Sequence, residues 1–294
     1  MRFETMDDYS TFMSNRKLKQ IFHRKLQLHF NTDKELLLPL DVHKIAISSP
    51  PNEDNCTAMI IYNHHSDLAF CRIGDSSWTA LGNQFVIPFH DIIYSSKRQL
   101  FYAITVIGNV QAWDLRDPSL PISKVIKYTY MHPSLEHPEE ISRVEYERCR
   151  YLVELPEGDF LIVIRYQSSI QEDGSLFYPE SMDIRSSSSC KTIWFDLRKL
   201  DVEKQTLEPV NHLGDDVLFL GANESFCLSA RDYPGLRPNC IYFSNDPPGM
   251  YMYKGKPYRG YDIGVYSLED FSISSLHPFE LHKIQPALWV FPRP

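Results

Sequence analysis

Tyrosines and cations alternate in one segment near the end of the chain, PPGMYMYKGKPYRGY (residues 247–261). Such side chains can stack on bases or clamp a peptide, because aromatic rings offer flat contact surfaces and cations add charge. Loops on a rigid scaffold often carry binding residues. The segment also fits an ordinary connection between strands whose tyrosines cover a sheet edge. The binding interpretation selects these partner-binding candidates: Tyr251, Tyr253, Lys254, Lys256, Tyr258 and Arg259.

Motifs of catalytic and metal sites are absent from the sequence. No GxSxG, HExxH, GxGxxG or P-loop pattern occurs. His64 and His65 are interpreted as a polar hairpin tip, since neighbouring strand residues point to opposite sides. His132 and His137 lie among glutamates in a proline-rich segment, which has the composition of a metal site without its spacing.

The pair Asp215–Asp216 is interpreted as turn acids, because alternation along a strand would separate the two carboxylates. We therefore expect no catalytic residues, no metal and no cofactor, and predict that the chain is not an enzyme.

Charge and cysteine content favour a protein of the cytoplasm or nucleus over an organellar one. The formal charge of −8 argues against nucleic-acid binding, which needs clustered cations. The six cysteines are scattered without a CxxC pair, so we expect reduced, mostly buried thiols. No secretory signal is seen, and no apolar run reaches the roughly 18 residues of a membrane span.

Short apolar runs between turn residues predict strands from Leu26 onward. The runs are too short for helices, and 17 Tyr, 17 Phe and 20 Pro favour strands with rigid turns. The expected strands are residues 26–30, 42–48, 57–62, 68–73, 78–81, 91–94, 99–105, 110–115, 151–155, 160–166, 193–197, 207–210, 217–220, 225–228, 240–243, 263–267 and 272–276. Residues 116–150 read as a polar, proline-containing excursion, and 167–189 as a second long loop.

A repeated unit divides these strands into blades. Four segments share an aromatic or apolar strand, a polar turn and a return strand, and they align at Phe70, Trp113, Trp194 and Val265. The spacings of 43, 81 and 71 residues fit a unit of about 40–45 residues, with two units in the second gap. We predict an all-β fold, a β-propeller of four-stranded antiparallel blades with about five or six blades' worth of sequence.

The N-terminal segment, residues 1–25, differs from the rest. It carries the run NRKLKQIFHRK, in which five cations accompany apolar residues at helical offsets. The run reads either as a nuclear-localisation or acidic-partner patch or as a short amphipathic or frayed terminal helix. We expect a helical or disordered segment over 1–25, and the propeller domain over 26–294.

Several longer runs resemble one plant family. They are LHFNTDKELLLPL, HKIAISSPP, LAFCRIGDSSWTAL, DIIYSSKRQLFYAITVIGNVQAWDL, YLVELPEGDFLIVIRY, LGDDVLFLGANESFCLSARDYPGLRPNCIYFSND, DIGVYSLEDFSISSLHP and PALWVFPRP. In this order they resemble the family that carries domain of unknown function 295, also called the KIB-type β-propeller. The resemblance runs from about Leu26 to the C-terminus.

The resemblance implies a propeller that recognises another protein. Members of the family typically carry an N-terminal F-box and are regarded as substrate receptors of SCF-type ubiquitin ligases, and some bind kinase-like targets. For this chain it implies a non-enzymatic protein-recognition module with an unidentified protein partner, no nucleic acid and no membrane.

The chain departs from the family pattern at its beginning. Residues 1–25 are too few to supply the helical F-box, which puts adaptor binding in doubt. The strands expected before LHFNTDKELLLPL are missing as well, so we expect an incomplete first blade with an exposed edge. Two alternatives stay open, a propeller-fold hydrolase acting at the central channel and a degenerate, truncated paralogue.

Overall fold

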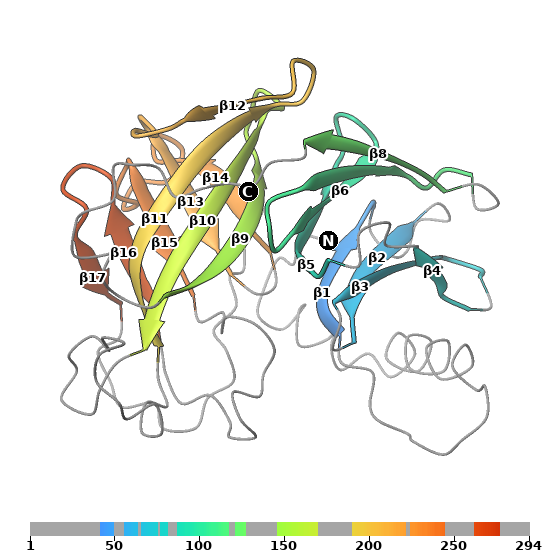
Figure 1. Cartoon of the computed structure of the whole chain (residues 1–294). Coiled ribbons are helices and arrows are strands. Elements are labelled where there is room, and N and C mark those ends of the chain that lie inside the picture. The colour runs from blue at the N-terminus through green and yellow to red at the C-terminus, as the bar shows by residue number, and fades with distance from the viewer. Residues whose placement is uncertain are drawn as a thin grey trace.

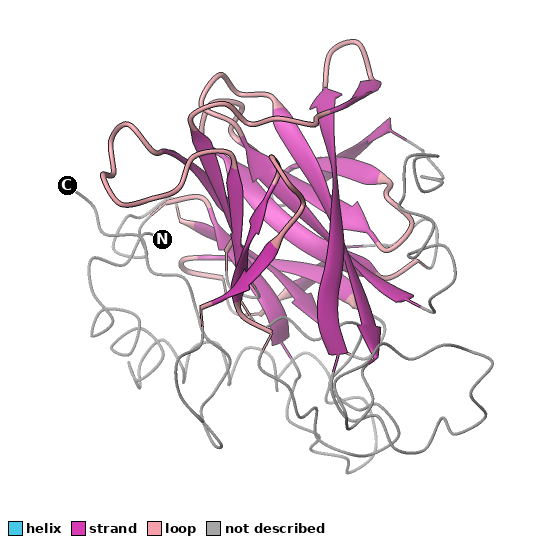
Figure 2. Ribbon diagram, turned by 90° about the vertical axis from the view of Figure 1, so that its left-hand side faces the viewer, coloured by secondary structure: helices cyan, strands magenta, loops and turns pink. Residues whose placement is uncertain are grey.

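The computed structural model describes residues 42–49, 56–63, 66–75, 77–81, 87–117, 121–127, 146–169, 190–221, 224–244 and 262–276. Within these ranges the chain forms seventeen β-strands and no helix, which confirms the expected all-β fold (Figure 2). The same ranges hold no helix that is long and apolar enough to cross a membrane. The N-terminal segment and all six partner-binding candidates lie outside the described residues.

Three of the four sheets are antiparallel and have four strands each, taken in chain order (Figure 1). The first sheet contains β1 (Val42–Ile47), β2 (Thr57–Tyr62), β3 (Asp67–Arg72) and β4 (Thr79–Leu81). The second contains β5 (Phe89–Ser95), β6 (Leu100–Thr105), β7 (Val110–Asp114) and β8 (Ile122–Lys127). The third contains β9 (Tyr146–Glu154), β10 (Phe160–Ser169), β11 (Cys190–Asp201) and β12 (Thr206–Pro209).

The fourth sheet has five strands and contains a parallel pair. Its order is β14-β13-β15-β16-β17. Its strands are β13 (Asp216–Leu220), β14 (Phe226–Ser229), β15 (Cys240–Phe243), β16 (Gly264–Ser267) and β17 (Ile273–Ser275). The connection 230–239 returns the chain to the start of β13, so β15 runs parallel to it. The expected four-stranded antiparallel plan therefore gains β14 here as a further strand.

Within the described residues the four sheets are the blades of a propeller, four blades where about five or six were expected. The aligned positions each fall in a different blade, with Phe70 in β3, Trp113 in β7, Trp194 in β11 and Val265 in β16. These are the third strands of the first three sheets and the corresponding strand of the fourth. The 81 residues between Trp113 and Trp194 therefore lead from one blade to the next through long connections, rather than through an additional blade in the described residues.

Two further expectations change at the first and second sheets. The first described sheet carries all four strands, where an incomplete blade was expected, because Val42–Ile47 pairs along most of β2. Strand β8 lies inside the stretch expected to be a polar excursion. It pairs with β7 on one side only, and its apolar residues do not alternate regularly with polar ones: Ile126 is buried but Ile122 is exposed, so the sequence does not show the period of a strand.

Central strands are apolar on both faces because sheets cover them from two sides. Every residue of β2 is buried, and residues Phe160–Ile164 of β10 form an unbroken buried apolar run. The exposed strands β4, β12 and β17 lie at sheet edges. The edge strand β9 is an exception, because its residues Tyr151, Leu152 and Val153 are buried against the neighbouring sheets.

Apolar clusters join each sheet to the next. Phe70 and Trp113 belong to a cluster between the first and second sheets. Tyr102 and Ile162 belong to one between the second and third, and a third cluster, with Phe195, lies between the third and fourth sheets. Each such side chain contributes roughly 1.5–3 kcal/mol on burial.

Candidate functional site

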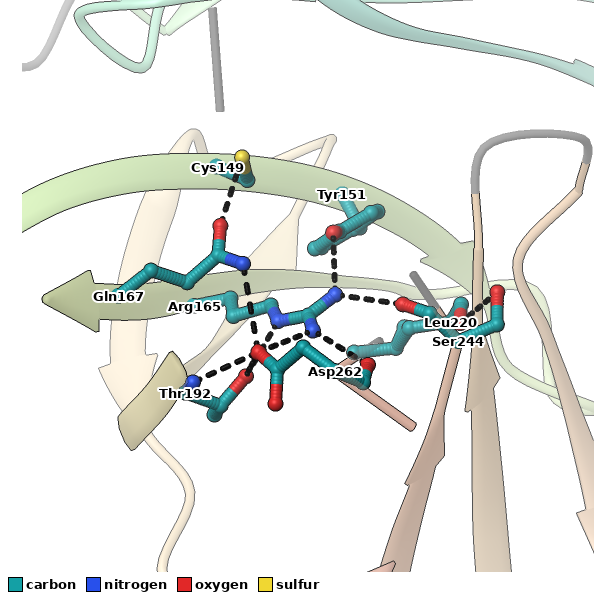
Figure 3. A network of polar contacts seen from close by, with 8 residues as sticks. All are labelled: Cys149, Tyr151, Arg165, Gln167, Thr192, Leu220, Ser244 and Asp262. Atoms are coloured by element: carbon teal, nitrogen blue, oxygen red, sulfur yellow. Dashed lines mark hydrogen bonds and ion pairs between the residues drawn. The ribbon is translucent and has the colours of Figure 1, made fainter. Parts of the chain in front are cut away.

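A buried arginine joins the third and fourth sheets (Figure 3). Arg165 of β10 is fully buried. Its Nη1 donates to the carbonyl of Ser244 at 2.8 Å and, at 3.4 Å, to the hydroxyl of Tyr151. Its Nη2 donates to Oδ2 of Asp262 at 2.9 Å, and its Nε donates to the hydroxyl of Thr192 at 2.7 Å. The guanidinium therefore has acceptors on both sheets, and we call this set of contacts the Arg165 network.

One carboxylate oxygen collects most of the donors in the Arg165 network. Oδ2 of Asp262 also accepts from the backbone N and the hydroxyl of Thr192, both at 2.6 Å, and from Gln167 at 3.4 Å. The ring of Phe243 lies 4.7 Å from the guanidinium carbon of Arg165 and adds a cation–π contact. A buried ion pair needs such additional hydrogen bonds to offset its desolvation. Thr192 and Gln167 supply these additional hydrogen bonds to Asp262.

The Arg165 network holds the ends of two long connections together. Ser244 precedes segment 245–261 and Asp262 follows it, and both contact Arg165. Segment 170–189 leaves β10 and returns to β11, where Ser169 pairs with Cys190. Thr192 then links the start of β11 to Asp262. The connection 245–261 therefore begins and ends at the Arg165 network, and the connection 170–189 begins and ends within a few residues of it. The six candidates between Tyr251 and Arg259 lie within 245–261.

A second polar centre lies where all four sheets meet. Lys44 of β1 forms a buried ion pair with Asp91 of β5 and donates to the carbonyl of Gly221 at 3.5 Å. The backbone N of Leu152 in β9 donates to Oδ2 of Asp91 at 2.9 Å. Each of these four groups comes from a different sheet. We call them the central hub.

Matching bulges place the hub side chains. The pairing of β1 shifts between Val42 and Lys44, and that of β5 shifts between Phe89 and Asp91. Each shift inserts a histidine, His43 in β1 and His90 in β5, directly before the charged residue. A bulge bends its strand and redirects the neighbouring side chains. The two bulges thus turn the hub residues toward the centre.

His90 is neutral beside the hub. Burial, then the charges of Arg150 and Lys44, lower the pKa of His90 to about 3. Its Nδ1 accepts from the backbone N of Arg150 at 3.2 Å, so the ring proton sits on Nε2. Burial also raises the pKa of Asp91, while Lys44 and the backbone donors act in the opposite direction. The centre therefore holds a structural ion pair and a neutral imidazole.

The remaining sequence candidates do not come together as a site. Asp215 pairs with Arg231 on the surface, and Asp216 begins β13. The pairs His64–His65 and His132–His137 lie outside the described residues. Among the described residues no group of three or more His, Cys, Asp or Glu side chains is placed to hold a metal ion. The five cysteines whose side chains are described form no disulfide with one another, in keeping with the expected reduced thiols.

The residues of the Arg165 network and the hub were not selected from the sequence. One signal was available: Arg165 interrupts the apolar run of β10, FLIVIRY, where a buried strand has no reason to carry a cation unless it is paired. Its partner Asp262 is 97 residues away along the chain. No local pattern links the two.

Comparison with known proteins agrees with this architecture. Residues 11–267 match the family described as KIB1-4 β-propeller, so the match begins upstream of the domain boundary expected at residue 26. A protein of Arabidopsis thaliana that carries the name of an F-box protein is 28% identical over 250 residues. The alignment covers 83% of this chain and 57% of that protein, so the chain spans little more than half the length of this relative.

Proposed function

Because the chain belongs to the KIB1-4 β-propeller family, we propose that it is a non-enzymatic module that recognises another protein. The observation that carries this proposal is the Arg165 network, which joins the ends of the two long connections at one buried point. Long connections on a rigid scaffold are where binding residues concentrate. In this proposal the partner contacts the end of the propeller from which 170–189 and 245–261 extend.

The proposed contact residues are the aromatic and basic ones of the connection 245–261. They are Tyr251, Tyr253, Lys254, Lys256, Tyr258 and Arg259. Tyrosine and arginine are enriched among residues that dominate binding energy at protein interfaces, which supports this choice. Lysines and arginine in a chain of net charge −8 would favour an acidic surface on the partner.

Delivery of the partner to a ubiquitin ligase is the finer part of the proposal. It rests on the name of the Arabidopsis relative, of which this chain covers little more than half. Three further points are proposed on the family resemblance of the sequence alone. They are recognition of a kinase-like target, assignment to domain of unknown function 295, and a location in the cytoplasm or nucleus. A fluorescent fusion tests the location, and co-precipitation with ligase adaptor subunits tests the delivery.

The hydrolase alternative gains no support from the described residues. A hydrolase at the central channel would need acids or histidines converging on an accessible point. The hub instead offers Asp91, which is fully buried and paired with Lys44, and His90, whose lowered pKa keeps it neutral.

The test of recognition is affinity capture with matched variants. The wild-type chain, a triple variant Tyr253→Ala/Lys254→Ala/Tyr258→Ala and an exposed-surface control, Lys204→Ala/Arg231→Ala, are compared by quantitative mass spectrometry of captured proteins. We expect one or a few proteins to be retained by the wild type and the control and to fall at least about tenfold with the triple variant. Equal retention by all three folded proteins, or no specific protein at all, would sink the proposal.

A further inference from the structure

Arg150 carries a buried charge that is paired with no carboxylate among the side chains that the structure describes. It lies in β9, the edge strand of the third sheet that faces β5 (Figure 1). The residue is 4% exposed, and its Nε is buried without a hydrogen-bond partner. Within the described part of the chain, no ion pair reaches its guanidinium. An isolated buried guanidinium is costly, because its desolvation is not offset.

The surroundings of Arg150 add positive charge. Arg148 lies two residues earlier in β9 and so on the same face of the strand. Burial and then the charge of Arg148 lower the pKa of Arg150 to about 10. The nearest described carboxylate in the hub, Asp91, is already paired with Lys44. The charge of Arg148 thus acts on Arg150 from the same face of the strand, and the carboxylate of Asp91 is taken up by Lys44.

His90 contacts the backbone of Arg150 and has a second ring nitrogen that can donate. Its Nδ1 accepts from the backbone N of Arg150, which leaves Nε2–H as a donor. The low pKa keeps the ring neutral, so it adds a hydrogen bond without further positive charge. A guanidinium and a neutral imidazole N–H are both donors suited to an oxyanion.

We propose that a small oxyanion, a phosphate or carboxylate group, binds Arg150 in the interface between the second and third sheets. A guanidinium presents parallel N–H donors that match the two oxygens of such a group. Because Arg150 is almost fully enclosed, the ligand is a small ion or molecule rather than a partner's surface. The site is separate from the segment 245–261 and does not rest on the proposed function.

The test measures binding of inorganic phosphate and of acetate at constant ionic strength. We expect saturable binding in isothermal titration calorimetry and a rise in Tm of about 5 °C at a hundredfold excess over Kd. A response to phosphate alone identifies a phosphate ligand, and a response to both identifies a general oxyanion site. Absence of saturable binding of either ion to the wild type overturns the proposal.

Variants assign the binding to Arg150. Arg150→Met is expected to abolish the Tm response, whereas Arg198→Met should keep it. Arg198 is the matched control, a half-buried arginine in the same sheet whose partner is Asp196. If Arg150→Met does not fold, Arg150→Lys is used instead. It keeps the positive charge but loses the parallel N–H donors of the guanidinium, so its affinity for the ion should fall about tenfold. Unchanged affinity in whichever variant folds contradicts the assignment.

Discussion

At the scale of single residues, the charge of Arg165 depends on one carboxylate. Desolvation by itself lowers the pKa of Arg165, and Tyr151 and Asp262 more than reverse this effect. The side chain therefore stays charged inside the interface. Removing its counter-charge leaves a buried cation, which costs far more than the loss of an exposed pair.

Asp262→Asn is expected to lower the free energy of unfolding by about 3–5 kcal/mol. The amide retains an acceptor but leaves Arg165 without a negative partner. Urea denaturation followed by tryptophan fluorescence measures the change. Asp270→Asn serves as the control, because Asp270 is exposed in the same sheet and accepts only from its own turn, and its effect should stay within about 0.5 kcal/mol. Equal losses in the two variants would contradict the role of the network.

His90 makes stability depend on pH. Its pKa of about 3 in the folded chain lies below the ordinary value of 6.5. The unfolded chain therefore gains a proton first as the pH falls, so the contribution is complete above pH 6.5 and is lost toward pH 3. Between pH 7.5 and pH 5 we expect a loss of at most about 2 kcal/mol, because only the part of this range below pH 6.5 contributes, at about 1.4 kcal/mol per pH unit.

Unfolding curves at pH 7.5, 6.5, 5.5 and 5.0 measure this loss. His90→Gln should flatten the pH dependence, while His212→Gln, at an exposed position, should reproduce the wild-type curve. If the stability of His90→Gln falls with pH as steeply as that of the wild type, the pH dependence comes from groups other than His90.

At the scale of elements, β16 approaches its neighbours too closely for any side chain at Gly264. A Cβ there would lie 2.7 Å from Cζ of Phe243 and 2.8 Å from the backbone oxygen of Ser274. Phe243 is fully buried in β15 and contacts Arg165 as well. The packing of these strands thus bears directly on the Arg165 network.

Gly264→Ala is expected to destabilise the chain by about 1–3 kcal/mol through overpacking. Gly214→Ala is the comparison, since its φ of +65° costs about 1 kcal/mol but nothing lies within 4 Å of the new Cβ. The two variants also differ in a second readout: only Gly264→Ala should change the near-ultraviolet circular dichroism of the buried aromatic rings. An identical spectrum and stability for the two variants would argue against the close approach.

At the scale of the whole molecule, the central hub connects all four sheets through four groups. The inner edge of β9 would otherwise expose its backbone donors, and Asp91 and His90 accept from two of them. Among the described residues, three apolar clusters each join two neighbouring sheets, whereas the hub contacts all four at once. The hub therefore favours unfolding as one unit.

Lys44→Met is expected to cost about 3–5 kcal/mol and to broaden the unfolding transition. It leaves Asp91 buried without a counter-charge and removes the contact with Gly221. The double variant Lys44→Met/Asp91→Asn should regain more than half of the loss, because an amide can still accept from Leu152. Lys204→Met, which removes an exposed pair with Asp201, should change little. Calorimetry measures both the stability and the width of the transition.

Much of the secondary structure follows from the sequence alone. The apolar runs at β2 and β15 predict strands with the observed bounds, because alternation, burial and turn residues are local properties. The repeat anchored at Phe70, Trp113, Trp194 and Val265 places one segment in each blade. Family membership follows from the same residues, since their order is retained over most of the chain.

The number of blades and the polar centres are decided only by the tertiary structure. A spacing of 81 residues is the same in the sequence whether it holds two blades or one blade with long connections. The strand at β14 is predicted from the sequence, but the parallel pairing of β13 with β15 depends on where the connection 230–239 returns. Arg165 and Asp262 are 97 residues apart, and Lys44 and Gly221 are 177 apart. Charges in separate strands meet only when the sheets pack around a common centre, because contact between distant segments depends on the whole fold rather than on local sequence.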